Sequence, residues 1–401
     1  MDGLAPAPEE GKPVSGADLP LPLGDFCLVE RLAEGGMAEV FLARRYDDPG
    51  EVLAIKLLHP SLAERMQFVE MFASEGQVAA LLHHPNIVRT YLAAQDGERC
   101  FICMEYLSGR ELRELTRYLN ERDQRLPVPV ALWITEQILE ALHHAHTALD
   151  AQGSPLDLVN RDVSPTNVML TFTGQVKLID FGIAQTTVGF TSQIGHIKGK
   201  IAYMSPEQVR GLPVDRRSDV FSAGIILHEL LTSRRLFTGE SDFSVMEAVR
   251  LALIPPPSVS NPLVEQELDR IVLRALERPV ARRFAGAREL GEALRRYREC
   301  RGQRYGEEEL AVLMRSAFLA HFRADEARLT RVRSLALPAR TASPGPDAGK
   351  ATQAGWPLEQ YLSRGMAAPG KLSLHSLLPV LVGLLLGLVL AAFIYYTVLG
   401  G

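Results

Sequence analysis

The chain has 401 residues, of which 47% are hydrophobic and 23% are charged, so it is long enough to bury one large or two moderate cores. Its formal net charge of -5 argues against a general nucleic-acid binder, because such proteins normally carry a basic excess. Four cysteines in a chain of this length do not make a disulfide framework.

The N-terminal segment, residues 1–24, is rich in proline, glycine and acidic residues. It has no apolar run of the kind found in signal peptides, so we expect a disordered leader. Residues 25–299 alternate strand-like and helix-like patterns joined by short turns.

Two strand-like runs between Leu28 and Arg45 are joined by a turn of small residues. Gly35 and Gly36 in this turn let the backbone approach a polyphosphate that larger side chains would block. An ordinary hairpin turn has the same appearance, so the motif alone is a weak signal.

A lysine on the next apolar strand, Lys56 in "VLAIKLL", is costly to bury unless it is paired or functional. Glu75, on a helical segment that follows, is an available partner. A lysine that holds phosphates while ion-paired to a helix glutamate is a known arrangement in phosphoryl transfer. Without that partner, an exposed edge lysine would be the better interpretation.

A C-x-x-C pair, Cys100 and Cys103, lies in a run that is typical of a buried strand. Residues three apart on a strand point to opposite faces, and no second Cys/His pair accompanies them. The pattern therefore favours core packing in a reducing compartment over a shared zinc ion.

A second cluster of polar residues follows in "NRDVSPTNVML", where Asp162 and Asn167 lie five residues apart before a β-prone run. The acidic motif "KLIDFG", which contains Asp180, comes ten residues later. This layout predicts a metal and phosphate site if the rest of the chain agrees.

The C-terminal part is predicted to contain a helical extension (300–335), a disordered linker (336–374) and an apolar segment (377–399). The apolar segment contains no charged residue, and as a helix it would be ~34 Å long, enough to cross a bilayer core. Arg364, Lys371 and the arginine-rich stretch upstream mark the preceding side as cytoplasmic. We expect a single-pass tail anchor in the inner or cell membrane, with a buried core helix as the alternative.

The order of motifs resembles the eukaryotic-type (Hanks-type) protein kinases, specifically the bacterial Ser/Thr kinases. The resemblance covers Asp25 to Tyr297 and rests on "AEGGMAEV", "AIK", Glu75, "HHPNIV", "MEYLSG", "NRDVSPTNV", "DFG", "AYMSPEQ" and "RSDVFSAGIILHELLT". It implies an α+β, bilobal kinase fold with a small β-rich N-lobe and a larger helical C-lobe.

The same resemblance implies ATP and Mg²⁺ as cofactors, with Mn²⁺ as an alternative metal. Asp162 would orient or deprotonate the substrate hydroxyl, and Asn167 and Asp180 would hold the metal. The residues implied at the nucleotide are Ala33, Glu34, Gly35, Gly36, Met37, Ala38, Val40, Ala54, Lys56, Glu75, Met104, Glu105 and Leu107. Two further acids would support the fold: Glu207 would pair with Arg282 or Arg283, and Asp219 would brace the catalytic loop.

Several positions depart from the family pattern. Ala33 and Ala38 replace the first and third glycines of the phosphate loop, and their methyl groups disfavour positive φ. Asn160 replaces a histidine that is largely a structural hydrogen-bonding residue, a role that Asn can also fill. Ser164 replaces a lysine that neutralises the transferred phosphoryl group, so this site is one positive charge short.

A compensating lysine, Lys200, stands where Ser/Thr kinases usually carry a threonine that bonds the catalytic Asp and the missing lysine. We interpret the two changes as a swap, in which Ser164 supplies the hydroxyl and Lys200 the ammonium group. Random drift in an inactive enzyme is the alternative.

Arg161, directly before the catalytic Asp, is expected to meet a phosphorylated activation-loop residue. The candidates are Thr186, Thr187, Thr191 and Ser192.

The leading functional hypothesis is a membrane-anchored Ser/Thr protein kinase that acts in cytoplasmic signalling. Its expected partners are protein substrates, membrane lipid and a second copy for autophosphorylation, with no nucleic acid. A pseudokinase scaffold and a small-molecule kinase are the alternatives. The motifs "SPTN" and "YMSPE" disfavour tyrosine specificity, although Lys200 weakens that inference.

Overall fold

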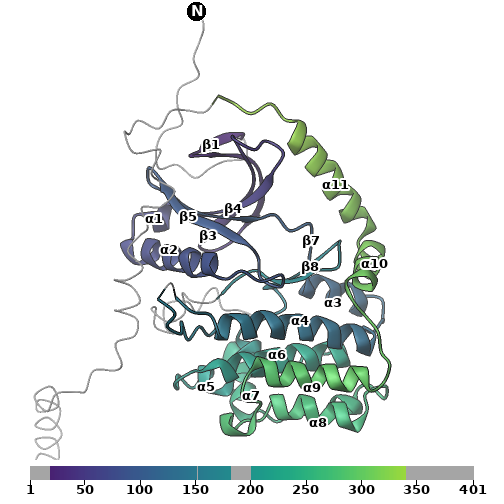
Figure 1. The fold of residues 1–401 in the computed structure, drawn as a ribbon. Helices are drawn as coiled ribbons and strands as arrows, with labels where there is room; N and C mark the ends of the chain where they lie inside the picture. The colour runs from purple at the N-terminus through teal and green to yellow at the C-terminus, as the bar shows by residue number, and fades with distance from the viewer. Residues whose placement is uncertain (1–18, 151, 182–199, 340–401) are drawn as a thin grey trace, which may run out of the picture. The chain divides into compact units, whose positions relative to one another are not determined.

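The computed structural model describes residues 19–150, 152–181 and 200–339, which form two lobes (Figure 1). The smaller lobe is mainly β-sheet and the larger lobe is mainly helical. The bilobal α+β architecture predicted from the sequence is confirmed.

The N-lobe is built on an antiparallel sheet with the strand order β1-β2-β3-β4-β6-β5. Its strands are β1 (Leu21–Leu23), β2 (Phe26–Glu34), β3 (Ala38–Arg45), β4 (Val52–Leu58), β5 (Thr90–Asp96) and β6 (Arg99–Glu105). Side chains on one face, Phe41, Ile55 and Phe101 among them, form a core separate from that of the C-lobe. Helices α1 (Pro60–Ala63) and α2 (Met66–Leu81) connect β4 to β5.

The end of the predicted leader is ordered, which corrects the expectation for residues 21–23. Strand β1 pairs with β2 from Leu21↔Leu28 to Leu23↔Phe26. Its two leucines are buried, while Pro22 between them sits on an edge strand, where a missing backbone N–H costs no ladder hydrogen bond. The proline-rich composition concealed this alternation. Residues 1–18 lie outside the described part of the chain.

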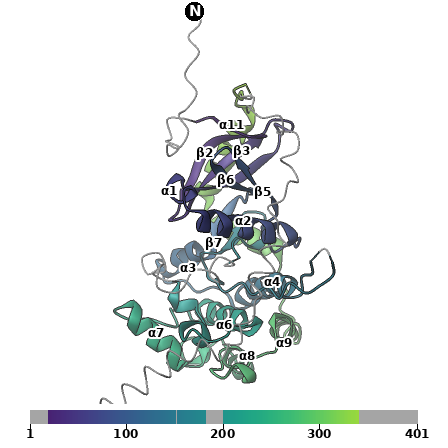
Figure 2. The same ribbon diagram turned by 90° about the vertical axis from the view of Figure 1, so that its left-hand side faces the viewer.

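Helix α2 packs against the N-lobe sheet (Figure 2). The approach is close at Gly76. A Cβ atom at this position would lie 2.6 Å from the Cβ of Ala93 and 2.8 Å from Cγ1 of Ile102. Only glycine fits such an approach without displacing the helix. The contact holds the neighbouring Glu75 close to the sheet.

The C-lobe is organised around α4 (Val128–His146) and α6 (Arg216–Thr232), which pack against each other and against α9. Both are buried over most of their length, and α6 also buries polar side chains, Asp219 and His228 among them. The other helical elements are α3 (Leu112–Asn120), η3 (Ile201–Tyr203), α5 (Pro206–Val209), α7 (Asp242–Leu251), η4 (Pro257–Val259), α8 (Gln266–Ala275), η5 (Val280–Arg282) and α9 (Ala287–Glu299).

A small antiparallel sheet, β7-β8-β9, lies where the lobes meet. Its strands are β7 (Gly109–Glu111), β8 (Val168–Thr171) and β9 (Val176–Leu178). The segment from Asn160 to Asn167 directly precedes β8, and Asp180 lies two residues after the end of β9. The sheet therefore brings both polar clusters of the sequence to one place.

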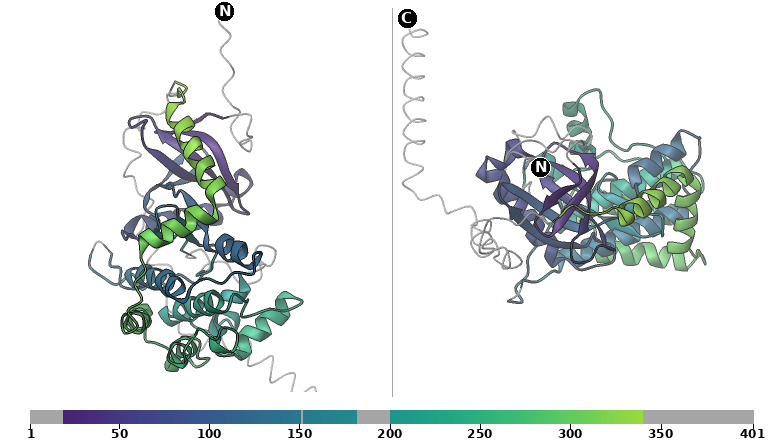
Figure 3. Two further views of the ribbon diagram at one scale, coloured as in Figure 1. Left: turned by 90° about the vertical axis from the view of Figure 1, so that its right-hand side faces the viewer. Right: turned by 90° about the horizontal axis from the view of Figure 1, so that it is seen from above.

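Two further helices, α10 (Glu307–Ala317) and α11 (Leu319–Ser334), follow α9. They run from the C-lobe along the connection between the lobes to the N-lobe sheet (Figure 3). Within residues 19–150, 152–181 and 200–339, no helix is long and apolar enough to cross a membrane. The predicted membrane helix, 377–399, lies outside these residues.

Candidate active site

Lys56 on β4 lies between two carboxylates. Its Nζ is 2.6 Å from Oε1 of Glu75 on α2 and 3.2 Å from Oδ1 of Asp180. Burial lowers the pKa of Lys56, but Asp180 and Glu75 outweigh burial, so the net shift is upward and the ammonium stays charged. A permanently charged, fixed lysine in the cleft suits the binding of phosphate oxygens.

The turn between β2 and β3 forms one wall of the cleft and is held by His59. The ring Nε2 of His59 is 2.8 Å from the carbonyl oxygen of Gly35. The backbone N–H of His59 donates to the carbonyl oxygen of Met37. Among the described residues, those with positive φ include neither Ala33 nor Ala38. The backbone conformation of these two alanines therefore does not require glycine.

The segment from Asn160 to Asn167 places Asp162 and Asn167 side by side. Asn167 Nδ2 donates to the backbone carbonyl of Asp162 at 2.9 Å and to its Oδ2 at 2.8 Å. Burial raises the pKa of Asp162, while Lys200 and Asn167 oppose the rise. A carboxylate with a raised pKa is better suited to accept a proton from a hydroxyl group.

A buried acid, Asp219 on α6, braces this segment from below. Its carboxylate accepts the backbone N–H groups of Asn160 at 2.8 Å and Arg161 at 2.9 Å, and it also contacts Nε2 of His146 at 2.7 Å. These bonds hold Arg161 at a φ of 64°, a conformation that a non-glycine residue adopts at a cost.

Asn160 bridges the two polar clusters. Its Oδ1 accepts the backbone N–H of Asp162 at 3.0 Å, and its Nδ2 donates to the backbone carbonyl of Asp180 at 3.0 Å. The asparagine thus makes the structural hydrogen bonds that the sequence reasoning expected of it.

Lys200 reaches the carboxylate of Asp162 directly. Its Nζ lies 2.6 Å from Oδ2 of Asp162, the oxygen that Asn167 also contacts. Ser164 behaves differently from the expected swap, because its Oγ is 2.9 Å from Oγ1 of Thr166, which is its hydrogen-bond partner among the described residues. The ammonium half of the swap has the predicted contact, and the hydroxyl half does not.

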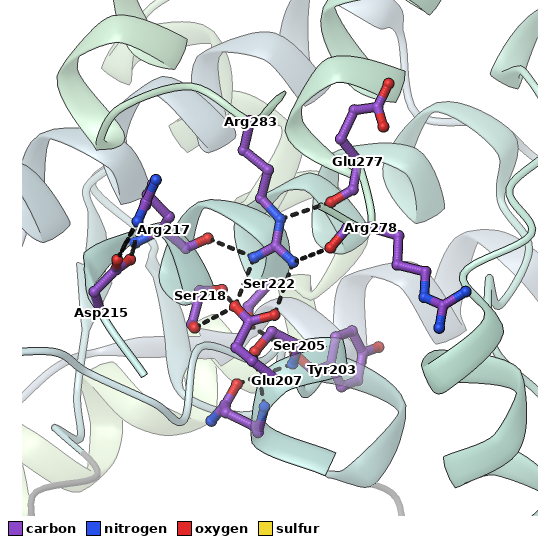
Figure 4. A network of polar contacts seen from close by, with 11 residues as sticks. Tyr203, Ser205, Glu207, Asp215, Arg217, Ser218, Ser222, Glu277, Arg278 and Arg283 are labelled. Atoms are coloured by element: carbon purple, nitrogen blue, oxygen red, sulfur yellow. Dashed lines mark hydrogen bonds and ion pairs between the residues drawn. The ribbon is translucent and has the colours of Figure 1, made fainter. Parts of the chain in front are cut away.

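Glu207 and Arg283 form a buried, two-pronged ion pair beneath the site (Figure 4). The distances are 2.6 Å from Nη1 to Oε1 and 2.8 Å from Nη2 to Oε2. Arg282 is exposed, so the structure resolves the ambiguity of "ARRF" in favour of Arg283.

The cleft has a volume of about 840 Å³. Twelve of the predicted site residues line the cleft: Ala33, Glu34, Gly35, Gly36, Met37, Ala38, Val40, Lys56, Ser164, Asn167, Asp180 and Lys200. Six others do not: Ala54, Glu75, Met104, Glu105, Leu107 and Asp162. Ala54 and Met104 are paired across β4 and β6.

A family model described as "Protein kinase domain" matches residues 26–289. The chain belongs to the protein kinase family.

Solved structures and curated proteins share this domain. The kinase domain of PknI from Mycobacterium tuberculosis superposes with a TM-score of 0.53 at 27% identity, covering 71% of this chain and 99% of that one. The tyrosine-protein kinase MasK of Myxococcus xanthus is 40% identical over 293 residues, which are 72% of this chain and 45% of MasK. The probable serine/threonine-protein kinase SCO3848 of Streptomyces coelicolor is 40% identical over 275 residues, or 67% and 39% of the two chains. The match thus spans less than half of either relative.

The donor set of this kinase domain fits a divalent cation. Asn167 uses Nδ2 for both of its hydrogen bonds to Asp162, which leaves its amide oxygen available as a ligand. Asp180 adds a half-exposed carboxylate. Oxygen ligands of this kind suit Mg²⁺ or Mn²⁺.

Sequence reasoning missed three supporting residues. His59 holds the phosphate-loop turn, and Thr166 bonds Ser164. Lys177 makes a 2.6 Å ion pair with Glu105, the last residue of β6, just before the connection between the lobes, residues 106–108, which we call the hinge. Thr166 and Lys177 lie inside quoted motifs but were given no role, and His59 lies outside them. The contacts of His59 and Lys177 join distant segments, whereas that of Thr166 is local. The candidate phosphorylation sites between Thr186 and Ser192 lie outside the described residues.

Proposed function

We propose that the chain is an active protein kinase that transfers the γ-phosphate of ATP to serine or threonine hydroxyls of proteins. The observation that carries the proposal is the pairing of Lys200 with Asp162 at 2.6 Å, because it returns a cation to a catalytic loop that lacks its usual lysine. The pseudokinase alternative gives no reason for this placement.

In the proposed mechanism, the side chains position the reactants and stabilise charge. Oδ2 of Asp162 is occupied by Lys200 and Asn167, so its Oδ1 is the atom that would receive the proton of the substrate hydroxyl. Lys56 would hold phosphate oxygens, and Glu75 fixes its ammonium group. A bound divalent cation, held by Asn167 and Asp180, would neutralise phosphate charge.

Replacing Asp162 with asparagine is expected to lower phosphate transfer by roughly 10³-fold, because an amide accepts no proton at neutral pH. Incorporation of radiolabelled phosphate from ATP, into the chain itself and into a generic protein acceptor, measures this loss. ATP binding should persist. Equal incorporation by the parent and the variant would contradict the proposed catalysis.

Tyrosine phosphorylation is a second candidate. The Myxococcus relative is described as a tyrosine-protein kinase, and Lys200 stands where Ser/Thr kinases usually carry a threonine. Phosphoamino-acid analysis of the labelled product separates the two: phosphoserine and phosphothreonine support the first candidate, and phosphotyrosine alone supports the second.

Membrane attachment through residues 377–399 is part of the proposal and rests on sequence alone. The uncharged segment has the length of a membrane span, and basic residues precede it. Truncation after Gly370 should move the kinase from the membrane fraction to the soluble fraction with its activity retained. A truncated protein that still sediments with membranes would refute the anchor.

A further inference from the structure

Helices α10 and α11, residues 307–334, run from the C-lobe to the N-lobe, and we call them the strap (Figure 3). At the C-lobe end, the ring of Phe318 packs 5.2 Å from that of Tyr118, and Phe322 packs 5.3 Å from Phe172. Arg315 also donates to the backbone carbonyl of Phe172 at 2.9 Å.

The other end of the strap is fixed to the N-lobe sheet. Arg44, buried on β3, donates to the backbone carbonyl of Val332 at 3.0 Å and to that of Leu335 at 2.5 Å. Arg328 lies 3.1 Å from the carboxylate of Glu30 on β2. The strap therefore has separate attachments to both lobes.

One buried carboxylate near the middle of α11, that of Asp325, accepts hydrogen bonds from the hinge between the lobes. Tyr106 donates its hydroxyl to Oδ1 of Asp325, and Ser108 donates its hydroxyl to Oδ2. Arg328, one helical turn on, lies 3.3 Å from Oδ1. Burial and the neighbouring carboxylate raise the pKa of Tyr106, so its hydroxyl stays protonated and remains a donor.

Tyr106 and Ser108 flank Leu107, and the resemblance to protein kinases implies that the backbone from Glu105 to Leu107 faces adenine. A carboxylate that holds both neighbours restricts the backbone between them, and such restriction lowers the entropy lost on binding. We propose that Asp325 is a positioning residue that presets the hinge for the adenine ring. This inference rests on the proposed function as far as the ligand is ATP.

Asp325→Ala, in the full-length chain purified in detergent, is expected to raise the Kd for Mg²⁺-ATP by roughly tenfold, the loss typical of a charge-assisted hydrogen-bond pair. Isothermal titration calorimetry measures this Kd without phosphate transfer. The KM for ATP should rise in parallel while kcat stays near the parental value, since Asp325 contacts neither Asp162 nor Lys200. Asp325→Asn keeps an acceptor and should recover part of the affinity.

Glu326→Ala is the matched control, because it removes the same charge from the next, exposed position of α11. Its Kd should equal that of the parent. If Asp325→Ala does not fold, the pair Tyr106→Phe with Ser108→Ala removes the same bonds from the hinge side and should raise the Kd likewise. Parental Kd values in the folded variants would overturn the inference and leave the proposed activity intact. A parent that transfers no phosphate, with ATP binding still weakened by Asp325→Ala, would overturn only the activity.

Discussion

Lys200→Ala is expected to lower kcat by about 10²-fold or more, the loss typical of one removed electrostatic stabiliser. The ammonium group lies 2.6 Å from Asp162, at the point where phosphoryl transfer develops charge. The KM for ATP should change little, because Lys56 and the metal ligands would still hold ATP in its ground state. Steady-state kinetics with a protein acceptor measures both parameters.

The pH profile provides a second readout of the same contact. Burial raises the pKa of Asp162 and Lys200 opposes that rise, so removing the lysine lets the pKa of the carboxyl group rise further. A base must be deprotonated to act, and the acidic limb of the kcat profile should therefore move to higher pH. A lysine that only stabilised the fold would leave this limb in place.

Two variants test the specificity of the effect. Arg210→Ala removes a positive charge from an exposed position ten residues away and should behave like the parent. Ser164→Lys combined with Lys200→Thr restores the usual family arrangement and should recover activity that either single change loses, as expected for coupled positions. Parental turnover by Lys200→Ala would mean that another group supplies the cation.

Arg283→Met is expected to destabilise the fold by ~3–5 kcal/mol, because it leaves the carboxylate of Glu207 buried without its partner. Urea denaturation at neutral pH measures the loss in free energy of unfolding. Arg282→Met is the matched control: this neighbouring arginine is exposed, so its removal should change stability by less than ~0.5 kcal/mol.

Acidification should reduce the difference between parent and Arg283→Met. Burial alone would raise the pKa of Glu207, but hydrogen bonds from Arg283 outweigh it and the net pKa is lowered. In the parent, the stabilisation is present above the unfolded pKa of ~4.3 and is lost as the pH falls below it. In the variant, burial dominates, so protonation favours the folded state. A gap of constant size across this range would contradict the ion-pair explanation.

Sequence alone predicted which residues would form the candidate site, because their identities sit in short, ordered motifs. The spacing of Asp162 and Asn167 before β8, and the place of Asp180 after β9, already implied one shared site. The bilobal fold followed from the same series of motifs.

Tertiary structure decided the contacts that join distant segments. The sequence left Arg282 and Arg283 equivalent. Only the folded chain shows that the side chain of Arg283 reaches Glu207 and the backbone carbonyl of Arg217 on α6. Pro22 made strand β1 unrecognisable from the sequence, because a proline is tolerated there only at the edge of a sheet. That β1 lies at the edge is known only from the structure.

The hydrogen bonds between Asp325 and the hinge are the clearest example of a contact that only the tertiary structure shows. Asp325 and Tyr106 are 219 residues apart, and no local pattern marks either as a partner. Local motifs predict the function of a segment, because the spacing of residues along the chain sets their local geometry. Contacts between segments depend on packing, and they exist only once both lobes and the strap have folded together.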